Sequence, residues 1–216
     1  MDLPKLLNKY YTLTPSFLYV TNKYLNNNYT IDHIAQRCVN SSLLLHYQRN
    51  NFILQPDVYN FPRFNVQANW LKPINIGNTH ECLNFRIFIS HYKQKCISKI
   101  FTYKDYLDIY EKNQYLAWTL LHKNDINHIA INVNDIEGFY EKLKDDCRLK
   151  ISTDNQISKD KKLKQFSLQA DKLRYNFSNG TYEVPYTFVE FIQRIDNRDG
   201  FESENADKIF DSTKIN

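Results

Sequence analysis

The sequence is short of glycine, which limits the ligands it can be expected to bind. Only four of its 216 residues are glycine. Their spacing matches neither the G-x-G-x-x-G turn of dinucleotide-binding proteins nor the P-loop, two motifs that need glycine where the backbone approaches a phosphate. The sequence therefore carries no nucleotide-binding motif.

Cysteines and long apolar runs are also scarce. The four cysteines form no Cys-x-x-Cys pair, and a chain of this length can bury a core without disulfides. We therefore expect free thiols in a reducing compartment. No stretch approaches the roughly 20 apolar residues that a membrane-spanning helix requires, and the N-terminal segment does not resemble a secretion signal. These absences predict a soluble, cytoplasmic protein with no membrane partner.

The chain has little excess of either charge. It contains 28 basic and 24 acidic residues, a net charge of +4, which is too mild an imbalance to indicate a nucleic-acid partner. The one dense basic run, residues 159–164, is interrupted by Asp160 and Leu163, and we expect it to be a loop between strands. The 16 tyrosines and 14 phenylalanines are spread along the chain, as core residues usually are. We predict no nucleic-acid binding.

The sequence does contain a repeated motif. Ile-Asp-His-Ile-Ala at 31–35 returns as Ile-Asn-His-Ile-Ala at 126–130, each time at the head of a run that alternates like a β-strand. The repeat favours a duplicated module in which His33 and His128 point away from the core, although two half-buried histidines could also lie on strands by chance. In the second copy, alternation predicts one face with Ile126, His128, Ala130 and Asn132, and an apolar face with Ile129, Ile131 and Val133.

Hydrophobic periodicity divides the chain into two modules and three further segments. We expect a helical cover (1–29), a first module (30–100), a linker helix (101–122), a second module (123–195) and a C-terminal segment (196–216). The expected strands lie at about 30–39, 64–71, 83–90, 126–133, 163–170, 172–178 and 184–194. Helices are expected after Asn40 or Ser41, from Thr102 to Leu121, after Asp135, and after Ser203, while Pro56 and Pro62 are expected to bracket a loop.

The last expected strand carries a single acidic residue, Glu190, on the same face as Arg194. A carboxylate on a half-buried strand needs a partner, and an ion pair with Arg194 is one possibility. The other is that Glu190 joins His33 and His128. Two imidazoles and one carboxylate on one side of a metal suit non-haem Fe(II), because open positions remain for substrates, whereas zinc prefers fewer ligands.

Five motifs, in order along nearly the whole chain, resemble the 2-oxoadipate dioxygenase/decarboxylase family of the vicinal oxygen chelate superfamily. They are DHIAQR (32–37), ANWLKP with RIFIS (68–90), AWTLLHKNDINHIAINVNDI (117–136), QFSLQAD (165–171), and VEFIQR followed by GFESENADKIFDSTK (189–214). The resemblance implies a single α+β domain, residues 1–216, in which duplicated β-α-β-β-β modules form a cup-shaped mixed sheet around a metal site, with extra N-terminal, linker and C-terminal helices. The C-terminal segment would cover the mouth of the cup.

The same resemblance implies a function and a set of site residues. It implies that Fe(II), or another divalent metal, is bound by His33, His128 and Glu190. The partners would be dioxygen and a small 2-oxo acid, with 2-oxoadipate converted to 2-hydroxyglutarate and carbon dioxide. Arg37 would bind a substrate carboxylate, and Gln165 and Ser167 would line the cup.

Geometry alone also supports the expectation for Arg37. It lies four residues beyond His33 on the same strand face, roughly 13 Å along the sheet, and its guanidinium fork matches a carboxylate. Two other functions stay open at this point. The chain could be a metal-dependent isomerase or lyase of the same superfamily, or a protein that binds a small acid without turnover.

Overall fold

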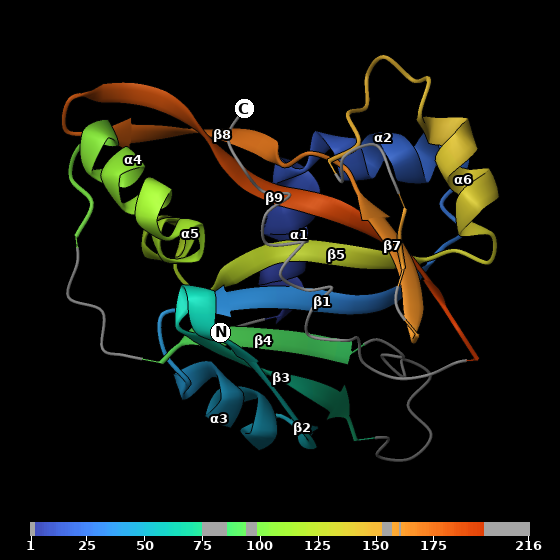
Figure 1. Ribbon diagram of the computed structural model, residues 1–216, viewed down its shortest axis with the longest axis horizontal. Coiled ribbons are helices and arrows are strands. Elements are labelled where there is room, and N and C mark those ends of the chain that lie inside the picture. Colours follow the sequence, from blue (N-terminus) through green and yellow to red (C-terminus); the bar gives the residue numbers. More distant parts are fainter. Residues whose placement is uncertain (1–2, 75–85, 94–98, 153–156, 160, 197–216) are drawn as a thin grey trace.

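The computed structural model describes residues 3–74, 86–93, 99–152, 157–159 and 161–196. Within these residues a nine-stranded mixed sheet has the order β2-β3-β4-β1-β5-β9-β7-β6, and β8 pairs with part of β9. Figure 1 shows β1 and β5 side by side at the middle of the sheet, with β4 and β3 below them and β9 above.

The strands and helices belong to two similar halves with helices before and between them. The first half contains β1 (Thr30–Cys38), α3 (Ser42–Arg49), β2 (Phe52–Phe61), a short 3₁₀ helix (Pro62–Phe64), β3 (Val66–Pro73) and β4 (Arg86–Tyr92). The second half contains β5 (Asp125–Asn132), α6 (Ile136–Leu143), β6 (Ser158–Lys159), β7 (Leu163–Ser167), β8 (Asp171–Phe177) and β9 (Gly180–Arg194). Helices α1 (Leu3–Leu13) and α2 (Pro15–Tyr24) precede both halves, and α4 (Tyr103–Lys112) and α5 (Gln114–His122) connect them.

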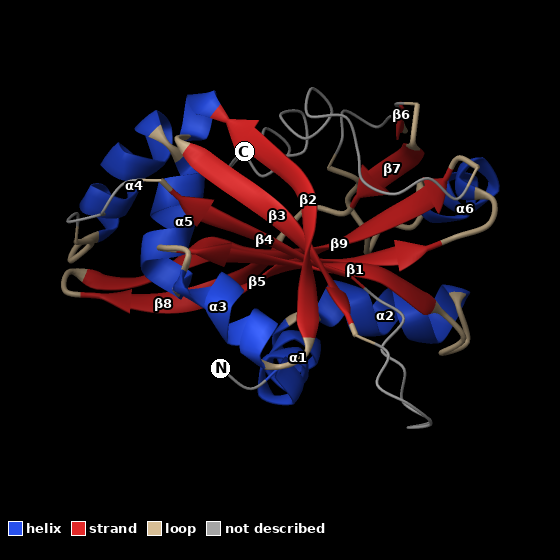
Figure 2. Ribbon diagram, turned by 90° about the horizontal axis from the view of Figure 1, so that it is seen from below, coloured by secondary structure: helices blue, strands red, loops and turns tan. Residues whose placement is uncertain are grey.

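The strand pairing repeats between the halves. The first strand of each half runs parallel to the last one, β1 to β4 and β5 to β9, and the two halves join through the antiparallel pair β1–β5. The predicted α+β fold with duplicated modules is therefore confirmed. Figure 2 shows β2 and β3 on one side and β6 and β7 on the other rising as the walls of a cup, with α1 and α2 beneath it.

The two faces of the sheet have different roles. The outer face carries the largest hydrophobic cluster, in which Ile34, Ile129 and Phe191 of the central strands pack against α1, α2, α3 and α6. The inner face of the first half carries a second cluster, with Ala35, Trp70 and Phe88 against Tyr115 of α5. The inner face is therefore apolar around the polar residues that it holds.

The linker differs from the single helix that we expected. The predicted capping box is present, because Thr102 accepts a hydrogen bond from the Asp105 amide and the Asp105 side chain accepts one in return. Helix α4 then ends at Lys112. The next residue, Asn113, has an extended backbone (φ −158°, ψ 95°), and its side chain caps α5 by accepting from the Leu116 amide. A residue that can cap the next helix thus divides the linker into two.

The segment between Pro56 and Pro62 was predicted to be a loop, and this prediction is wrong. Residues 52–61 form β2, an edge strand that pairs with β3. The register shifts between Leu54 and Val58, on either side of Pro56. Proline is tolerated in such a place because an irregular edge does not need its missing N–H.

Three smaller predictions have different outcomes. Asp135 caps α6 as expected, accepting from the Gly138 amide. The basic run at 159–164 is not simply a loop, because Lys159 belongs to β6 and Leu163 and Lys164 begin β7. The helix expected after Ser203, with the rest of the C-terminal segment from 197 onward, lies outside the described residues.

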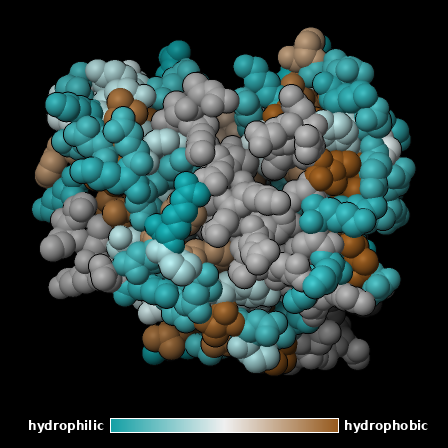
Figure 3. Space-filling model, viewed as in Figure 1, coloured by the Kyte–Doolittle hydropathy of each residue, from teal (hydrophilic) through white to brown (hydrophobic). Residues whose placement is uncertain are grey.

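The described part of the face shown in Figure 3 is mainly hydrophilic. On the face shown in Figure 3, hydrophobic residues form separate patches among hydrophilic ones. Among the described residues, the helices are all too short or too polar to cross a membrane.

Candidate metal centre

Two irregularities in the β1–β5 ladder place the histidines. Between Ile31 and His33 the strand β1 has one extra residue, Asp32, and further along the ladder β5 has one extra residue, Asn127. A β-bulge of this kind sets two residues against one on the partner strand and re-aims the side chains beside it. Each bulge thus lies directly before one histidine.

The bulge residues hold the rings of the histidines that follow them. The Nδ1 atom of His33 lies 2.8 Å from an oxygen of Asp32, and the Nδ1 atom of His128 lies 3.1 Å from the side-chain oxygen of Asn127. A carboxylate or amide oxygen can only accept a hydrogen bond. Both Nδ1 atoms therefore carry a proton, so that in the neutral form of each ring Nε2 presents a lone pair.

The bulge at Asn127 also corrects one prediction from strand alternation. Ile126 was expected to share a face with His128, but it packs in the outer cluster with Ile129 and Ile131. The extra residue reverses the alternation on one side of the bulge. His128 nevertheless lies on the inner face, as predicted.

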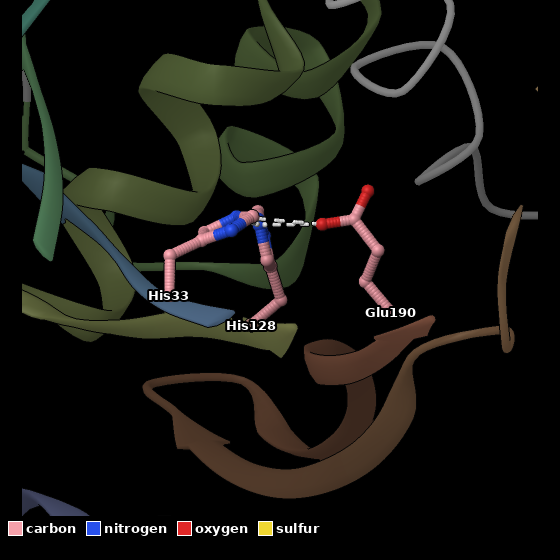
Figure 4. Close-up of side chains that lie close together, drawn as sticks. All are labelled: His33, His128 and Glu190. Atoms are coloured by element: carbon pink, nitrogen blue, oxygen red, sulfur yellow. Dashed lines mark hydrogen bonds and ion pairs between the residues drawn. The ribbon is translucent and has the colours of Figure 1, made fainter. Parts of the chain in front are cut away.

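His33, His128 and Glu190 converge on one point (Figure 4). The Nε2 atoms of the two histidines are 3.3 Å apart. An oxygen of Glu190 lies 3.5 Å from Nε2 of His33 and 3.3 Å from Nε2 of His128. The strand register explains why these side chains lie close together. Ala130 of β5 pairs with both His33 and Glu190, and its small methyl group leaves space between their side chains.

This arrangement fits a bound cation. Three hydrogen-bond acceptors face one another, all buried, with exposed fractions of 5% for His33, 9% for His128 and 2% for Glu190. Acceptors in a buried site need a donor or a positive charge between them. Neutral imidazole nitrogens and a carboxylate oxygen are ligands that bind a divalent transition metal.

The protonation states of these groups agree with that reading. Burial lowers the pKa of His128, against the opposing effect of Glu190, and so favours the neutral ring. Burial would raise the pKa of Glu190, but the positive charge that His128 or His33 carries when protonated lowers it below its ordinary value. At neutral pH the site therefore offers a carboxylate beside a neutral imidazole.

Arg37 lies on the inner face and is buried, as its place on β1 predicted. Its guanidinium carbon is 5.1 Å from the ring centre of Tyr115 and 5.5 Å from that of Trp118. Burial lowers the pKa of Arg37 to about 10, so the side chain remains charged at neutral pH. Arg37 and Phe188 both line one small pocket, and Phe188 stacks on His128 with the ring centres 4.7 Å apart.

Gln165 and Ser167 lie on β7 next to the candidate ligands. Ser167 pairs with Glu190 in the ladder, and Gln165 pairs with Ile192, so both share the inner face with Glu190. Both are buried. Among the described residues, Nε2 of Gln165 and Oγ of Ser167 have no hydrogen-bond partner. Unsatisfied buried polar atoms are unusual in native proteins, and these two are free to bind a ligand.

The sequence reasoning missed the residues behind the histidines. It named neither Asp32 nor Asn127, although each copy of the repeated motif has an aspartate or asparagine directly before its histidine. It considered Arg194 as a partner of Glu190, whereas the side chain of Arg194 binds Asp32. The repeat of Asp or Asn before His was the available signal.

Comparisons with known sequences point to one family. Residues 96–196 match the family described as 2-oxoadipate dioxygenase/decarboxylase. A chloroplastic protein of that name from Arabidopsis thaliana is 30% identical over 128 residues, 47% of this chain and 34% of that protein. Its counterpart from Oryza sativa subsp. japonica is 31% identical over 137 residues, 51% of this chain and 38% of that protein. The matched region is thus little more than a third of the length of these curated relatives.

Comparisons of structure extend the likeness to nearly the whole chain. A hydroxyglutarate synthase from Oryza sativa, solved in complex with 2-oxoadipate, has a TM-score of 0.80 at 22% identity, covering 98% of this chain and 90% of that one. A protein described as glyoxalase superfamily, from Ralstonia eutropha JMP134, has a TM-score of 0.70 at 15% identity, covering 88% of this chain and 80% of that one. Residues 96–196 are therefore similar in sequence to the 2-oxoadipate dioxygenase/decarboxylase family, and nearly the whole chain shares its fold with the solved hydroxyglutarate synthase.

Proposed function

We propose that the protein is an Fe(II)-dependent dioxygenase/decarboxylase that converts 2-oxoadipate and dioxygen to 2-hydroxyglutarate and carbon dioxide. The observation that carries the proposal is the buried convergence of His33, His128 and Glu190, with three acceptors facing one point. The names of the relatives indicate the reaction, because they are 2-oxoadipate dioxygenases/decarboxylases.

His33, His128 and Glu190 would hold the metal. Two histidines and one carboxylate are typical of non-haem Fe(II) oxygenases and leave coordination positions open. Bound Fe(II) would supply the site for dioxygen and for the 2-oxo acid, and the electrons that activate dioxygen. In the overall reaction the C1–C2 bond of the substrate breaks. One oxygen atom enters the new carboxylate at the former keto carbon, and the other becomes the hydroxyl group on the neighbouring carbon.

The chain itself would bind and orient the substrate. Gln165 and Ser167 place unsatisfied polar atoms beside Glu190, where they can hydrogen-bond the carboxylate next to the keto group. Arg37 places a buried positive charge in the adjoining pocket, where it can bind the distal carboxylate. A diacid would then be held at both ends, with its reacting carbons between them.

Aromatic rings would keep water from the centre. Trp70 approaches His33 edge-on, with ring centres 5.0 Å apart, and Trp70 in turn packs on Phe88 at 4.6 Å. On the other side Phe188 covers the ring of His128. An apolar wall on each histidine limits solvent access and lowers the local dielectric, and both strengthen the attraction between a cation and its ligands.

The test is turnover after metal loading without oxygen. The metal-free protein would be loaded anaerobically with Fe(II), and oxygen uptake and carbon dioxide release would be measured on adding 2-oxoadipate. We expect equal amounts of both, with 2-hydroxyglutarate as product, and we expect His128→Ala to show neither. Metal binding without oxygen uptake across a series of 2-oxo acids would contradict the proposal and favour isomerase or lyase chemistry. Acid binding without metal would favour a binding protein.

A further inference from the structure

The two histidines of the candidate centre differ in the groups that hold them. Nδ1 of His33 donates to the carboxylate of Asp32, whereas Nδ1 of His128 donates to the amide oxygen of Asn127. The two bulges are otherwise equivalent in their position before the histidine. One ring is therefore supported by a charge and the other by a neutral group.

The Asp32 carboxylate is in turn held by Arg194. Nη2 of Arg194 lies 2.6 Å from Oδ1 of Asp32, and Nε lies 3.0 Å from Oδ2. Both side chains are buried, with exposed fractions of 7% and 6%. Arg86 adds a longer contact of 3.5 Å to Oδ2. Two parallel hydrogen bonds from one guanidinium fix the plane of a carboxylate as well as its position.

Strand β9 connects this pair to the metal site directly. It carries Glu190 and, four residues later, Arg194 at its last position. Residues four apart on a strand share a face, so β9 can supply a ligand and also reach across β5 to the bulge of β1. The corresponding residue of β4, four after Phe88, is Tyr92. The two halves of the fold thus have different residues at this position.

We propose that Arg194 is a positioning residue for the metal centre. By holding Asp32, it keeps the proton of His33 on Nδ1 and the ring in one orientation, so that Nε2 faces the metal. The inference rests on the proposed metal site. Arg194 then raises metal affinity without contacting metal or substrate, since carboxylates behind metal-binding histidines typically change affinity 10- to 100-fold.

The experiment is a titration of the metal-free chain with Mn²⁺, following the EPR signal of free Mn²⁺. The variants are Arg194→Gln, Arg194→Lys, Asp32→Asn and the double change Arg194→Gln with Asp32→Asn. Arg174→Gln is the matched control, because Arg174 forms an exposed ion pair with Glu183 on the β8–β9 hairpin. We expect Arg194→Gln to weaken Mn²⁺ binding about 10- to 100-fold, and Arg194→Lys to weaken it less, because lysine keeps the charge without the fork. Arg174→Gln should bind as wild type does.

The double variant separates positioning from a general effect on the fold. If Arg194 acts through Asp32, the double variant binds Mn²⁺ no more weakly than Asp32→Asn alone. Losses that add would overturn the inference, and so would wild-type affinity in Arg194→Gln. If Arg194→Gln does not fold, the folded Arg194→Lys variant decides, and wild-type affinity there overturns the inference. Failure of the wild-type chain to bind Mn²⁺ or Fe(II) would instead refute the proposed metal site.

Discussion

Phe88 stands in the first half of the fold where Glu190 stands in the second. Phe88 of β4 pairs with Ala35, two residues after His33, and Glu190 of β9 pairs with Ala130, two residues after His128. The duplicated modules therefore bring four equivalent positions to the centre, two on the first strands and two on the last. Three carry possible metal ligands and the fourth carries an aromatic ring.

The first prediction tests whether this ring keeps the site open. Phe88→Glu should add a fourth ligand at a position that substrates need. We expect the variant to bind Mn²⁺ at least as tightly as wild type, while oxygen uptake with 2-oxoadipate falls roughly tenfold or more, a barrier increase of at least about 1.4 kcal/mol. The measurements are the Mn²⁺ titration and an oxygen electrode.

The matched control is Phe88→Leu, which removes the ring but adds no ligand. It should leave Mn²⁺ affinity nearly unchanged and lower oxygen uptake much less than the glutamate does. The prediction fails if the glutamate and leucine variants lose oxygen uptake equally.

A second prediction follows from the three acceptors that face one another. Glu190→Gln replaces an acceptor by an amide, whose N–H groups can donate to Nε2 of His33 or His128. At pH 8 and without metal, we expect the variant to be more stable than wild type by about 1 to 3 kcal/mol, since a buried unsatisfied group costs about that much. The melting temperature should rise by roughly 2 to 4 °C for each kcal/mol of added stability in a chain of this size.

Metal addition should reverse the order of stability. Mn²⁺ should raise the melting temperature of wild type strongly and that of Glu190→Gln little, because the variant lacks the carboxylate. Glu183→Gln, at an exposed position of β9, is the control and should change neither value. If the metal-free Glu190→Gln variant melts at a lower temperature than wild type, the three facing acceptors do not destabilise the metal-free protein, and the prediction fails.

The fold could be predicted from the sequence to the extent that its signals are local or repeated. The motif shared by residues 31–35 and 126–130 predicted the duplicated module. The Thr102 and Asp135 caps predicted the starts of α4 and α6. Strand β2 was missed because Pro56 suggests a loop, and only the free edge of the sheet makes a proline there acceptable.

Within the site, side chains on regular strands were predictable and those at bulges were not. Arg37 follows His33 at even spacing and lies on the same face, as expected. Ile126 was misplaced because the register at Asn127 depends on the partner strand β1, which the sequence of β5 alone does not specify. The contact between Arg194 and Asp32 spans 162 residues, and charge pairing across that separation has no local signal.

The third prediction concerns stability at low pH and the half-buried His122. Burial lowers the pKa of His122 to about 4, and Nε2 of the ring lies 3.1 Å from the carbonyl oxygen of Pro185. The unfolded chain binds a proton near the ordinary value of about 6.5, before the folded chain does. Stability is therefore full above pH 6.5 and falls as the pH drops toward 4, by up to about 3 kcal/mol from this group.

His122→Gln should remove this loss, because glutamine can donate to the Pro185 carbonyl but does not titrate. The measurement is urea unfolding of the metal-free protein at pH 7.5 and at pH 4.5. We expect the difference between the two pH values to be smaller in His122→Gln than in wild type by about 2 to 3 kcal/mol. His46→Gln on α3, a half-buried histidine away from the cup, should leave the difference unchanged. An unchanged difference in His122→Gln would contradict the assignment.

The last prediction separates a diacid substrate from a simple 2-oxo acid. If the buried guanidinium of Arg37 binds the distal carboxylate, Arg37→Ala should lower kcat/KM for 2-oxoadipate about 10- to 100-fold, since a charge-assisted hydrogen bond contributes roughly 1.5 to 3 kcal/mol. A 2-oxo monoacid of the same chain length has no distal charge, so its kcat/KM should change little. Arg37→Lys should restore part of the preference, because lysine supplies the charge without the fork.

The control must separate binding from packing, because Arg37 also lies against the rings of Tyr115 and Trp118. Arg37→Met fills similar space without charge, and it should show the same loss of preference for the diacid with a melting temperature near that of wild type. Equal losses for diacid and monoacid would mean that Arg37 binds the carboxylate beside the keto group. If neither substrate is affected while the melting temperature falls, Arg37 is a structural residue, because a side chain that only packs contributes to the fold and not to the choice of substrate.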